Sequence, residues 1–150
     1  MRVVIQRVQG CSVAVAGNVI GEIGKGLAIL LGVEEADTQE DIDWLCAKIS
    51  RLRIFDDENG VMNLDIQQVG GQAIVISQFT LFASTKKGNR PSYIRSAAEP
   101  ISRPMYEKFL ATLSEALGAD VEHGEFGADM QVSLVNDGPV TICIDSKNKE

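Results

Sequence analysis

The stretch from Ala73 to Leu81 constrains the fold most, because its character changes half-way along. Residues 73–76 are Ala-Ile-Val-Ile, the apolar and β-branched composition of a buried strand. Ser77, Gln78 and Thr80 then place two hydroxyls and an amide at the end of that strand. Buried polar groups cost free energy unless they are hydrogen-bonded. The stretch therefore predicts a core strand that either opens onto a functional site or simply leaves the core.

The length and composition predict one folded domain. The chain has 150 residues, and we expect residues 1–150 to form a single domain. Hydrophobic residues make up 45% of it, which is enough for a core. The longest apolar run, residues 27–31, is too short to cross a bilayer, and Arg2 and Arg7 interrupt the apolar N-terminal stretch. We therefore expect a cytoplasmic protein that does not bind membranes.

The cysteines predict neither disulfides nor a metal site. Cys11, Cys46 and Cys143 are odd in number and far apart, so each is interpreted as a small buried hydrophobe. No cluster of His, Cys or Asp has metal-ligand spacing, and no glycine-rich phosphate-binding motif is present. We expect no metal and no cofactor. The single histidine, His123, is expected in a surface loop rather than in a catalytic triad.

The charge distribution is uneven. The net charge of −7 argues against non-specific nucleic-acid binding and thus against DNA as a partner. Residues 86–103 nevertheless carry five basic side chains against one acidic one, a local charge of +4: Lys86, Lys87, Arg90, Arg95 and Arg103 against Glu99. This segment is either a solvated loop or a patch that attracts an anionic substrate.

Periodicity predicts more strands than helices. A capping box of Thr38 and Asp41 precedes one amphipathic helix, and a second is expected from the N-cap Ser102 to Gly118, which stops it. The expected strands are residues 3–8, 12–15, 19–23, 27–33, 73–76, 131–135 and 140–144, the last two forming a hairpin. Helices do not alternate with strands, so we predict an α+β fold: a mainly antiparallel or mixed sheet that closes like a barrel, with two principal helices.

Two short motifs carry a resemblance to a known family. Ser77-Gln78-Phe79-Thr80-Leu81 and residues 136–141, Asn-Asp-Gly-Pro-Val-Thr, together resemble the paired signature of the D-aminoacyl-tRNA deacylases. Further segments resemble the family in the same order along nearly the whole chain: residues 1–8, 52–55, 62–64, 87–92 and 124–128.

The resemblance implies an enzyme that hydrolyses the ester joining a D-amino acid, or glycine, to the terminal adenosine of tRNA. It also implies a homodimer in which a cis Gly138-Pro139 peptide reaches into the partner's site and excludes L-amino acids. Without the resemblance, the residues of that turn predict an ordinary hairpin with a trans X-Pro bond.

The resemblance implies roles for nine residues. Thr80 is a nucleophile or a positioning residue, and backbone amides near Phe79 are oxyanion donors. No base stands near Thr80 in sequence, so hydrolysis assisted by the substrate 2′-OH is favoured. The expected substrate-binding residues are Ser77, Gln78, Gly138, Pro139, Arg7, Phe126 and Met130.

Several alternatives stay open at this point. Phe126 and Met130 line an adenine pocket or pack in the core, and Arg7 braces the Gly-Pro turn across the dimer or is a strand-end charge. The competing functions are a non-enzymatic nucleic-acid-binding module on the same fold and a small-molecule esterase.

Overall fold

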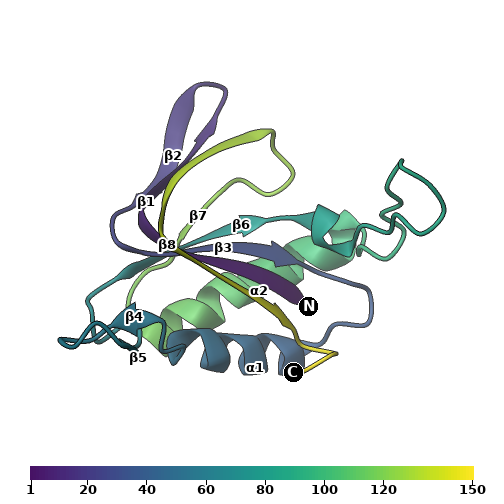
Figure 1. The fold of residues 1–150 in the computed structure, drawn as a ribbon. Helices are drawn as coiled ribbons and strands as arrows, with labels where there is room; N and C mark the ends of the chain where they lie inside the picture. The colour runs from purple at the N-terminus through teal and green to yellow at the C-terminus, as the bar shows by residue number, and fades with distance from the viewer.

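A mixed six-stranded sheet forms the centre of the computed structural model, which describes residues 1–150 (Figure 1). Strand β1 pairs antiparallel with β2, β3 and β8, whereas β3, β6 and β7 run parallel to one another. The elements are β1 Arg2–Val15, β2 Asn18–Ile23, β3 Gly26–Gly32, α1 Gln39–Ser50, β4 Phe55–Asp56, β5 Met62–Leu64, β6 Gln72–Ser77, the 3₁₀ helix η1 Phe79–Phe82, α2 Glu99–Leu117, β7 Glu122–His123 and β8 Met130–Asp145. The predicted α+β fold with a barrel-like mixed sheet and two principal helices is confirmed.

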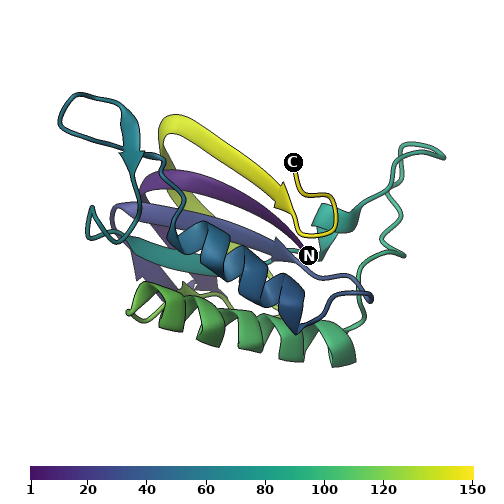
Figure 2. The same cartoon turned by 90° about the horizontal axis from the view of Figure 1, so that it is seen from below.

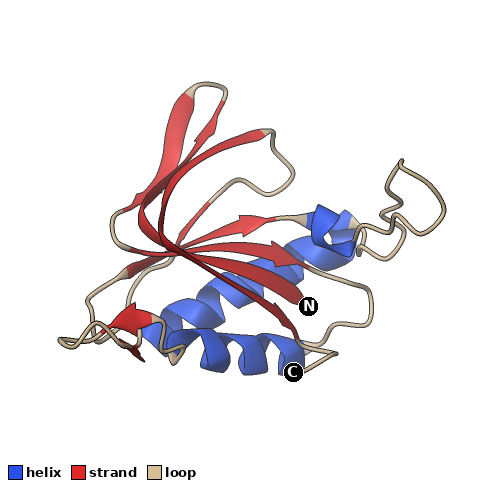
Figure 3. Ribbon diagram, viewed as in Figure 1, coloured by secondary structure: helices blue, strands red, loops and turns tan.

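Both α-helices cover one face of the sheet, and the main core lies between the two layers (Figures 2 and 3). The helical spacing of Ile42, Leu45 and Ile49 in α1 buries all three, and Phe109 and Leu113 of α2 are buried with them. On the other side of the sheet, a smaller cluster fills the curled part formed by β1, β2, β3 and β6: Val8, Cys11, Val13, Ile23, Ala28 and Ile74.

Two predictions about where strands end are wrong. Residues 3–8 and 12–15 belong to one continuous strand, β1, because both halves pair with β8. Residues 131–135 and 140–144 likewise belong to one strand, β8, instead of folding back on each other. The register between β1 and β8 shifts at Val8, and β8 bends there rather than reversing. The Gly138-Pro139 segment is therefore an interruption within a long strand.

Three smaller predictions also need correction. Helix α2 begins at Glu99, with Pro100 in its first turn, so Ser102 lies inside the helix and is not its N-cap. His123 lies at the end of the short strand β7, where pairing with Val75 of β6 orders it. Cys143 is exposed, whereas Cys11 and Cys46 are buried as expected.

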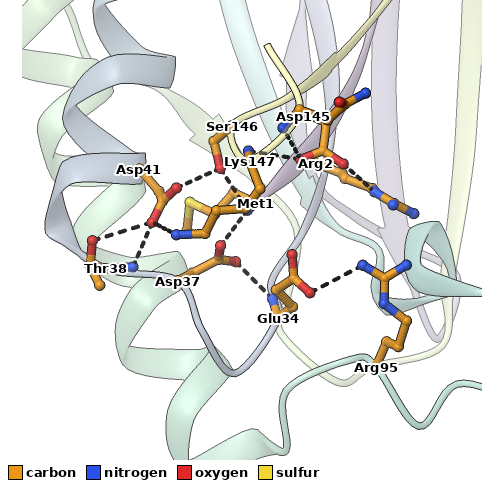
Figure 4. Close-up of polar contacts among 11 residues, drawn as sticks. Met1, Arg2, Glu34, Asp37, Thr38, Asp41, Arg95, Asp145, Ser146 and Lys147 are labelled. Carbon is orange, nitrogen blue, oxygen red and sulfur yellow. Dashed lines mark hydrogen bonds and ion pairs between the residues drawn. The ribbon is translucent and has the colours of Figure 1, made fainter.

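A polar cluster joins the two chain ends to α1 (Figure 4). The Met1 ammonium group donates hydrogen bonds to Asp37 and to Ser146 Oγ. Ser146 Oγ and Lys147 Nζ donate to the Asp41 carboxylate, both at 2.7 Å. Burial alone would raise the pKa of Asp41, but the hydrogen bonds from Lys147 and Ser146 outweigh it and lower the pKa below its usual range. The cluster thus fixes β1 and the end of β8 against α1.

Candidate active site

A pocket of about 300 Å³ lies where the parallel strands β3 and β6 end. Leu31 of β3 pairs with Ser77 of β6, so both strands deliver their last residues to the same edge of the sheet. Helix α2 forms one wall, and the segment leading into β8 forms another. Fourteen residues line the pocket: Leu31, Val33, Ile76, Ser77, Gln78, Phe79, Ser96, Ser102, Tyr106, Phe126, Gly127, Ala128, Met130 and Val132. Nine of these are hydrophobic, so the pocket suits a largely apolar group.

The polar end of β6 turns away from the sheet at Gln78. Its N–H donates to the carbonyl of Leu31 at 2.7 Å, and the chain then enters η1. The Gln78 side-chain amide donates to Thr80 Oγ1, which links Thr80 to the pocket although Thr80 does not line it. The main-chain N–H groups of Phe79 and Thr80 have no acceptor within the chain. Two hydrogen-bond donors are thus free beside the pocket.

Aromatic and apolar side chains form the far wall. The ring of Phe126 lies 5.6 Å from that of Tyr106, and the Arg103 guanidinium lies 4.8 Å over the Phe126 ring. The Tyr106 hydroxyl donates to the carbonyl of Val75 at 2.9 Å, and burial raises the pKa of Tyr106. Tyr106 is therefore a fixed neutral wall of the pocket, and its hydroxyl is occupied by β6.

The Gly138-Pro139 peptide is cis, as the family resemblance implied and the residues alone did not. Arg7 supports this segment. Its Nε donates to the carbonyl of Asp137 at 3.0 Å, and its Nη1 donates to the carbonyl of Ile54 at 2.7 Å. Arg7 is buried in the middle of β1, so it is not a strand-end charge. It braces the segment of its own chain.

Comparisons with known proteins show which family the chain belongs to. A family model described as D-Tyr-tRNA(Tyr) deacylase matches residues 4–145. The chain belongs to this family. Curated relatives of the deacylase family named D-aminoacyl-tRNA deacylase include those of Bacteroides thetaiotaomicron, at 63% identity, and Bacteroides fragilis, at 65%. Both alignments cover 100% of each chain. The predicted family and enzyme class are confirmed.

Two solved structures share the deacylase fold. One, titled "c-Myc DNA Unwinding Element Binding Protein", is 36% identical with a TM-score of 0.90, covering 97% of this chain and 98% of that one. The other, titled a probable eukaryotic D-amino acid tRNA deacylase, is 15% identical with a TM-score of 0.82, covering 95% and 97%. The second likeness concerns the fold alone.

The two motifs that carry the family resemblance, residues 77–81 and 136–141, do not meet at the pocket within one chain. The Gly138-Pro139 segment lies beside Arg7, which pairs with Leu27 in β3, and Leu27 pairs with Ala73 at the start of β6. Three strand-to-strand steps separate the segment from β6, roughly 14 Å, and Ser77 lies roughly 13 Å further along that strand. The pocket contains no residue of the Gly138-Pro139 segment.

Sequence reasoning missed part of the pocket. Ser96, Ser102 and Tyr106 line it. The sequence predicted only a loop residue, a helix cap and a core aromatic residue at these three positions. The available signal was Tyr106, because its hydroxyl interrupts an otherwise apolar run of large buried side chains, Tyr106, Phe109 and Leu113. His123 does not line the pocket, and its Nδ1 lies 2.7 Å from the carbonyl of Gly124. No group of three His, Cys, Asp or Glu side chains lies close enough together to hold a metal ion.

Proposed function

We propose that this chain hydrolyses the ester between a D-amino acid, or glycine, and the terminal adenosine of tRNA. The observation that carries the proposal is the pair of free N–H groups of Phe79 and Thr80 at the rim of an apolar pocket. The pocket holds the adenine ring, with Phe126 and Met130 as its walls, and the ester lies at the rim beside Phe79. Ser77 and Gln78 line the pocket between the adenine ring and the ester.

The chemistry is a water attack on an activated ester. Water adds to the carbonyl carbon, and the N–H groups of Phe79 and Thr80 donate to the negative charge that develops on the carbonyl oxygen. The bond between this carbon and the 3′-oxygen then breaks, the 3′-oxygen takes a proton, and free tRNA and the amino acid leave. The substrate 2′-OH assists, because no side-chain base lies beside Thr80. Thr80 positions this turn through its hydrogen bond with Gln78.

Stereochemical selection requires a second copy of the chain. In a homodimer, Gly138 and Pro139 of the partner present their carbonyls to the α-carbon, leaving room only for hydrogen where an L-residue carries its side chain. Steric exclusion of this kind rejects the wrong substrate without requiring tight binding of the right one. The separation of the two motifs within one chain supports this arrangement. The outer edge of β8 also supports it, because β8 pairs only with β1 and carries exposed Val132, Leu134 and Val135.

The remaining expectations concern partners and location. The acceptor end of aminoacyl-tRNA is the proposed partner, and the reaction above uses no cofactor and no metal. No helix has an apolar stretch long enough to span a bilayer. We propose a cytoplasmic enzyme, since its substrate is used in translation there, and we propose neither membrane nor DNA as a partner.

One solved structure of the same fold suggests a second candidate function, nucleic-acid binding without catalysis. The solved structure at 36% identity is titled a DNA-unwinding-element-binding protein, so a nucleic-acid-binding module on this fold is the alternative. The net charge of −7 weighs against it, because non-specific DNA binding depends on neutralising phosphates.

The test is a comparison of three esters. Purified protein is incubated with D-tyrosyl-tRNA, L-tyrosyl-tRNA and glycyl-tRNA, and loss of the ester is followed. We expect the D-tyrosyl and glycyl esters to be hydrolysed and the L-tyrosyl ester to be spared. Equal hydrolysis of both tyrosyl esters would refute the stereochemical wall. No hydrolysis of any ester, with retained binding to DNA, would favour the binding module.

A further inference from the structure

Two exposed aromatic rings, those of Phe79 and Tyr93, stand at the rim of the pocket, and the proposed reaction uses the main-chain N–H of Phe79 but neither ring. The rings of Phe79 and Tyr93 meet edge to face with their centroids 5.0 Å apart. Phe79 is 56% exposed and Tyr93 is 38% exposed, and the neighbouring Ile94 is 90% exposed. Large apolar surface of this kind in a soluble protein often marks a binding site.

The loop that carries Tyr93 is fixed at its base. The main chains of Ser84 and Ser92 exchange two hydrogen bonds, at 2.8 and 2.9 Å, just before Tyr93. The Ser96 N–H donates to the Tyr93 carbonyl at 2.9 Å, just after it. Tyr93 is therefore held between two anchored points, and its ring is preorganised beside Phe79.

The segment between Ser84 and Ser92 is positively charged. Residues 85–91 project from the body of the protein beside η1 and the start of α2 (Figures 1 and 2). Lys86, Lys87 and Arg90 are exposed there, and none of them forms an ion pair within the chain. An aromatic surface beside unpaired cations is the usual combination for binding single-stranded nucleic acid, whose bases stack while the cations contact the phosphates.

We propose that Tyr93, together with the outer side of the Phe79 ring, is a stacking platform for the nucleotide that precedes the terminal adenosine of the substrate. The inference rests on the proposed function, since it takes the adenosine to occupy the pocket that Phe79 lines. Phe79 then contacts the terminal nucleoside on one side and the next base on the other. The cations of residues 85–91 lie where the phosphates of the next nucleotides toward the 5′ side pass.

The test compares a nucleoside ester with a trinucleotide ester. The substrates are the D-tyrosyl esters of adenosine and of the trinucleotide CpCpA. In the wild-type protein we expect the trinucleotide ester to have the higher kcat/KM. Tyr93→Ala should lower kcat/KM for the trinucleotide ester by about tenfold, the scale of one base–aromatic stack, and leave the adenosine ester unchanged. Tyr93→Phe should keep the wild-type preference.

Ile94→Ala is the matched control, because it removes exposed apolar surface from the same loop without removing a ring. It should leave both esters unchanged. An equal effect of Tyr93→Ala on the two esters, or no effect on either, would overturn the platform. A change in dimer mass on Tyr93→Ala would also overturn it and would assign the ring to a subunit contact.

A binding measurement separates this proposal from the proposed function. Fluorescently labelled CpCpA without an amino acid should bind the wild type and bind Tyr93→Ala about tenfold more weakly. If neither ester is hydrolysed but this difference in binding holds, the platform is supported and the hydrolytic function fails. Hydrolysis of both esters with equal binding of CpCpA to both proteins would refute the platform alone.

Discussion

The guanidinium of Arg7 lies 3.0 Å, from Nε to oxygen, from the carbonyl of Asp137, the residue that precedes Gly138-Pro139. Its Nη1 simultaneously holds the carbonyl of Ile54 and approaches Asp56 Oδ1 at 3.3 Å. The planar guanidinium can donate in two directions at fixed angles, which a lysine cannot do. Arg7 therefore links the bend in β8 to the segment before β4.

Arg7→Lys should reduce deacylation more than it reduces stability. The ammonium cannot hold both carbonyls, so the Gly138-Pro139 segment loses its fixed position. Small misplacement of a group that orients a substrate can cost about 100-fold in rate. We expect a loss of that order in kcat/KM for D-tyrosyl-tRNA, and about 1–2 kcal/mol in the free energy of unfolding measured in urea. Arg53→Lys is the control, because Arg53 is exposed and donates only to the carbonyl of Asn63. Arg7→Lys with wild-type kcat/KM would contradict the bracing role.

Gly138→Ala should inactivate the enzyme, whereas Gly88→Ala should not. Both glycines have a strongly positive φ, +125° and +135°, which an alanine adopts only with strain. A Cβ at Gly138 would also lie 3.0 Å from Val140 Cγ2 and 3.1 Å from Arg7 Nη2, whereas nothing lies within 4 Å at Gly88. The two variants thus share the backbone strain and differ in the contact. Assays of D- and L-tyrosyl-tRNA should show lost activity only for Gly138→Ala, and equal activity of the two variants would contradict this.

The sequence predicted which residues form helices and strands better than it predicted where one strand ends and the next begins. The helical spacing of Ile42, Leu45 and Ile49 and the capping pair of Thr38 and Asp41 depend on local interactions, and both predictions are confirmed. The joining of residues 131–135 and 140–144 into β8 was missed, because Asn-Asp-Gly-Pro reads locally as a turn. Only pairing of both halves with β1, more than 100 residues away in sequence, keeps the strand running in one direction.

Some residues of the candidate site could be predicted from the sequence and others could not. The difference again lies between local sequence patterns and tertiary contacts. The polar end at Ser77 and Gln78 could be recognised, because its residue types break an apolar pattern within a few positions. The contribution of Ser96 and Tyr106 could not, since it depends on how α2 packs beside β6. The contact of Arg7 with Asp137 likewise depends on the register of β1 and β8.

Thr80→Val should slow hydrolysis without abolishing it. If Thr80 only positions η1 through Gln78, loss of its hydroxyl should cost about tenfold in kcat, near the value of one hydrogen bond. A substrate ending in 2′-deoxyadenosine should react more slowly still, by about 100-fold or more, because the proposed reaction depends on assistance by the 2′-OH. Thr112→Val in α2 is the control, since Thr112 makes no side-chain hydrogen bond. A loss beyond about 1,000-fold in Thr80→Val, with an active deoxy substrate, would identify Thr80 as the nucleophile.

Asp41→Asn should lower stability near neutral pH and make it less dependent on pH in acid. The lowered pKa of Asp41 means that its ionised form stabilises the folded state. This contribution is complete above the unfolded pKa of about 3.9 and is lost as the pH falls through the lower folded value. We expect a loss of about 2 kcal/mol in the free energy of unfolding near pH 7. The difference from wild type should shrink at about pH 3.

Asp43→Asn is the matched control for that measurement. Asp43 lies on the same helix but is exposed and accepts only from Gln39. Urea unfolding of the three proteins across the acid range should show the wild type and Asp43→Asn losing stability together, with Asp41→Asn following a flatter curve. A curve for Asp41→Asn that is parallel to the wild type would contradict the role given to the cluster in Figure 4.

The cross-subunit site is tested most directly by mixing two inactive variants. One is Gly138→Ala, and the other is Phe79→Pro, which removes one of the two free N–H groups at the first position of η1. In a mixed dimer, one site receives both altered parts and the other receives both intact parts. Each homodimer should be inactive, and heterodimers confirmed by mass should recover about half of the wild-type rate on D-tyrosyl-tRNA while sparing L-tyrosyl-tRNA. Confirmed heterodimers that stay inactive would contradict a site shared between two chains.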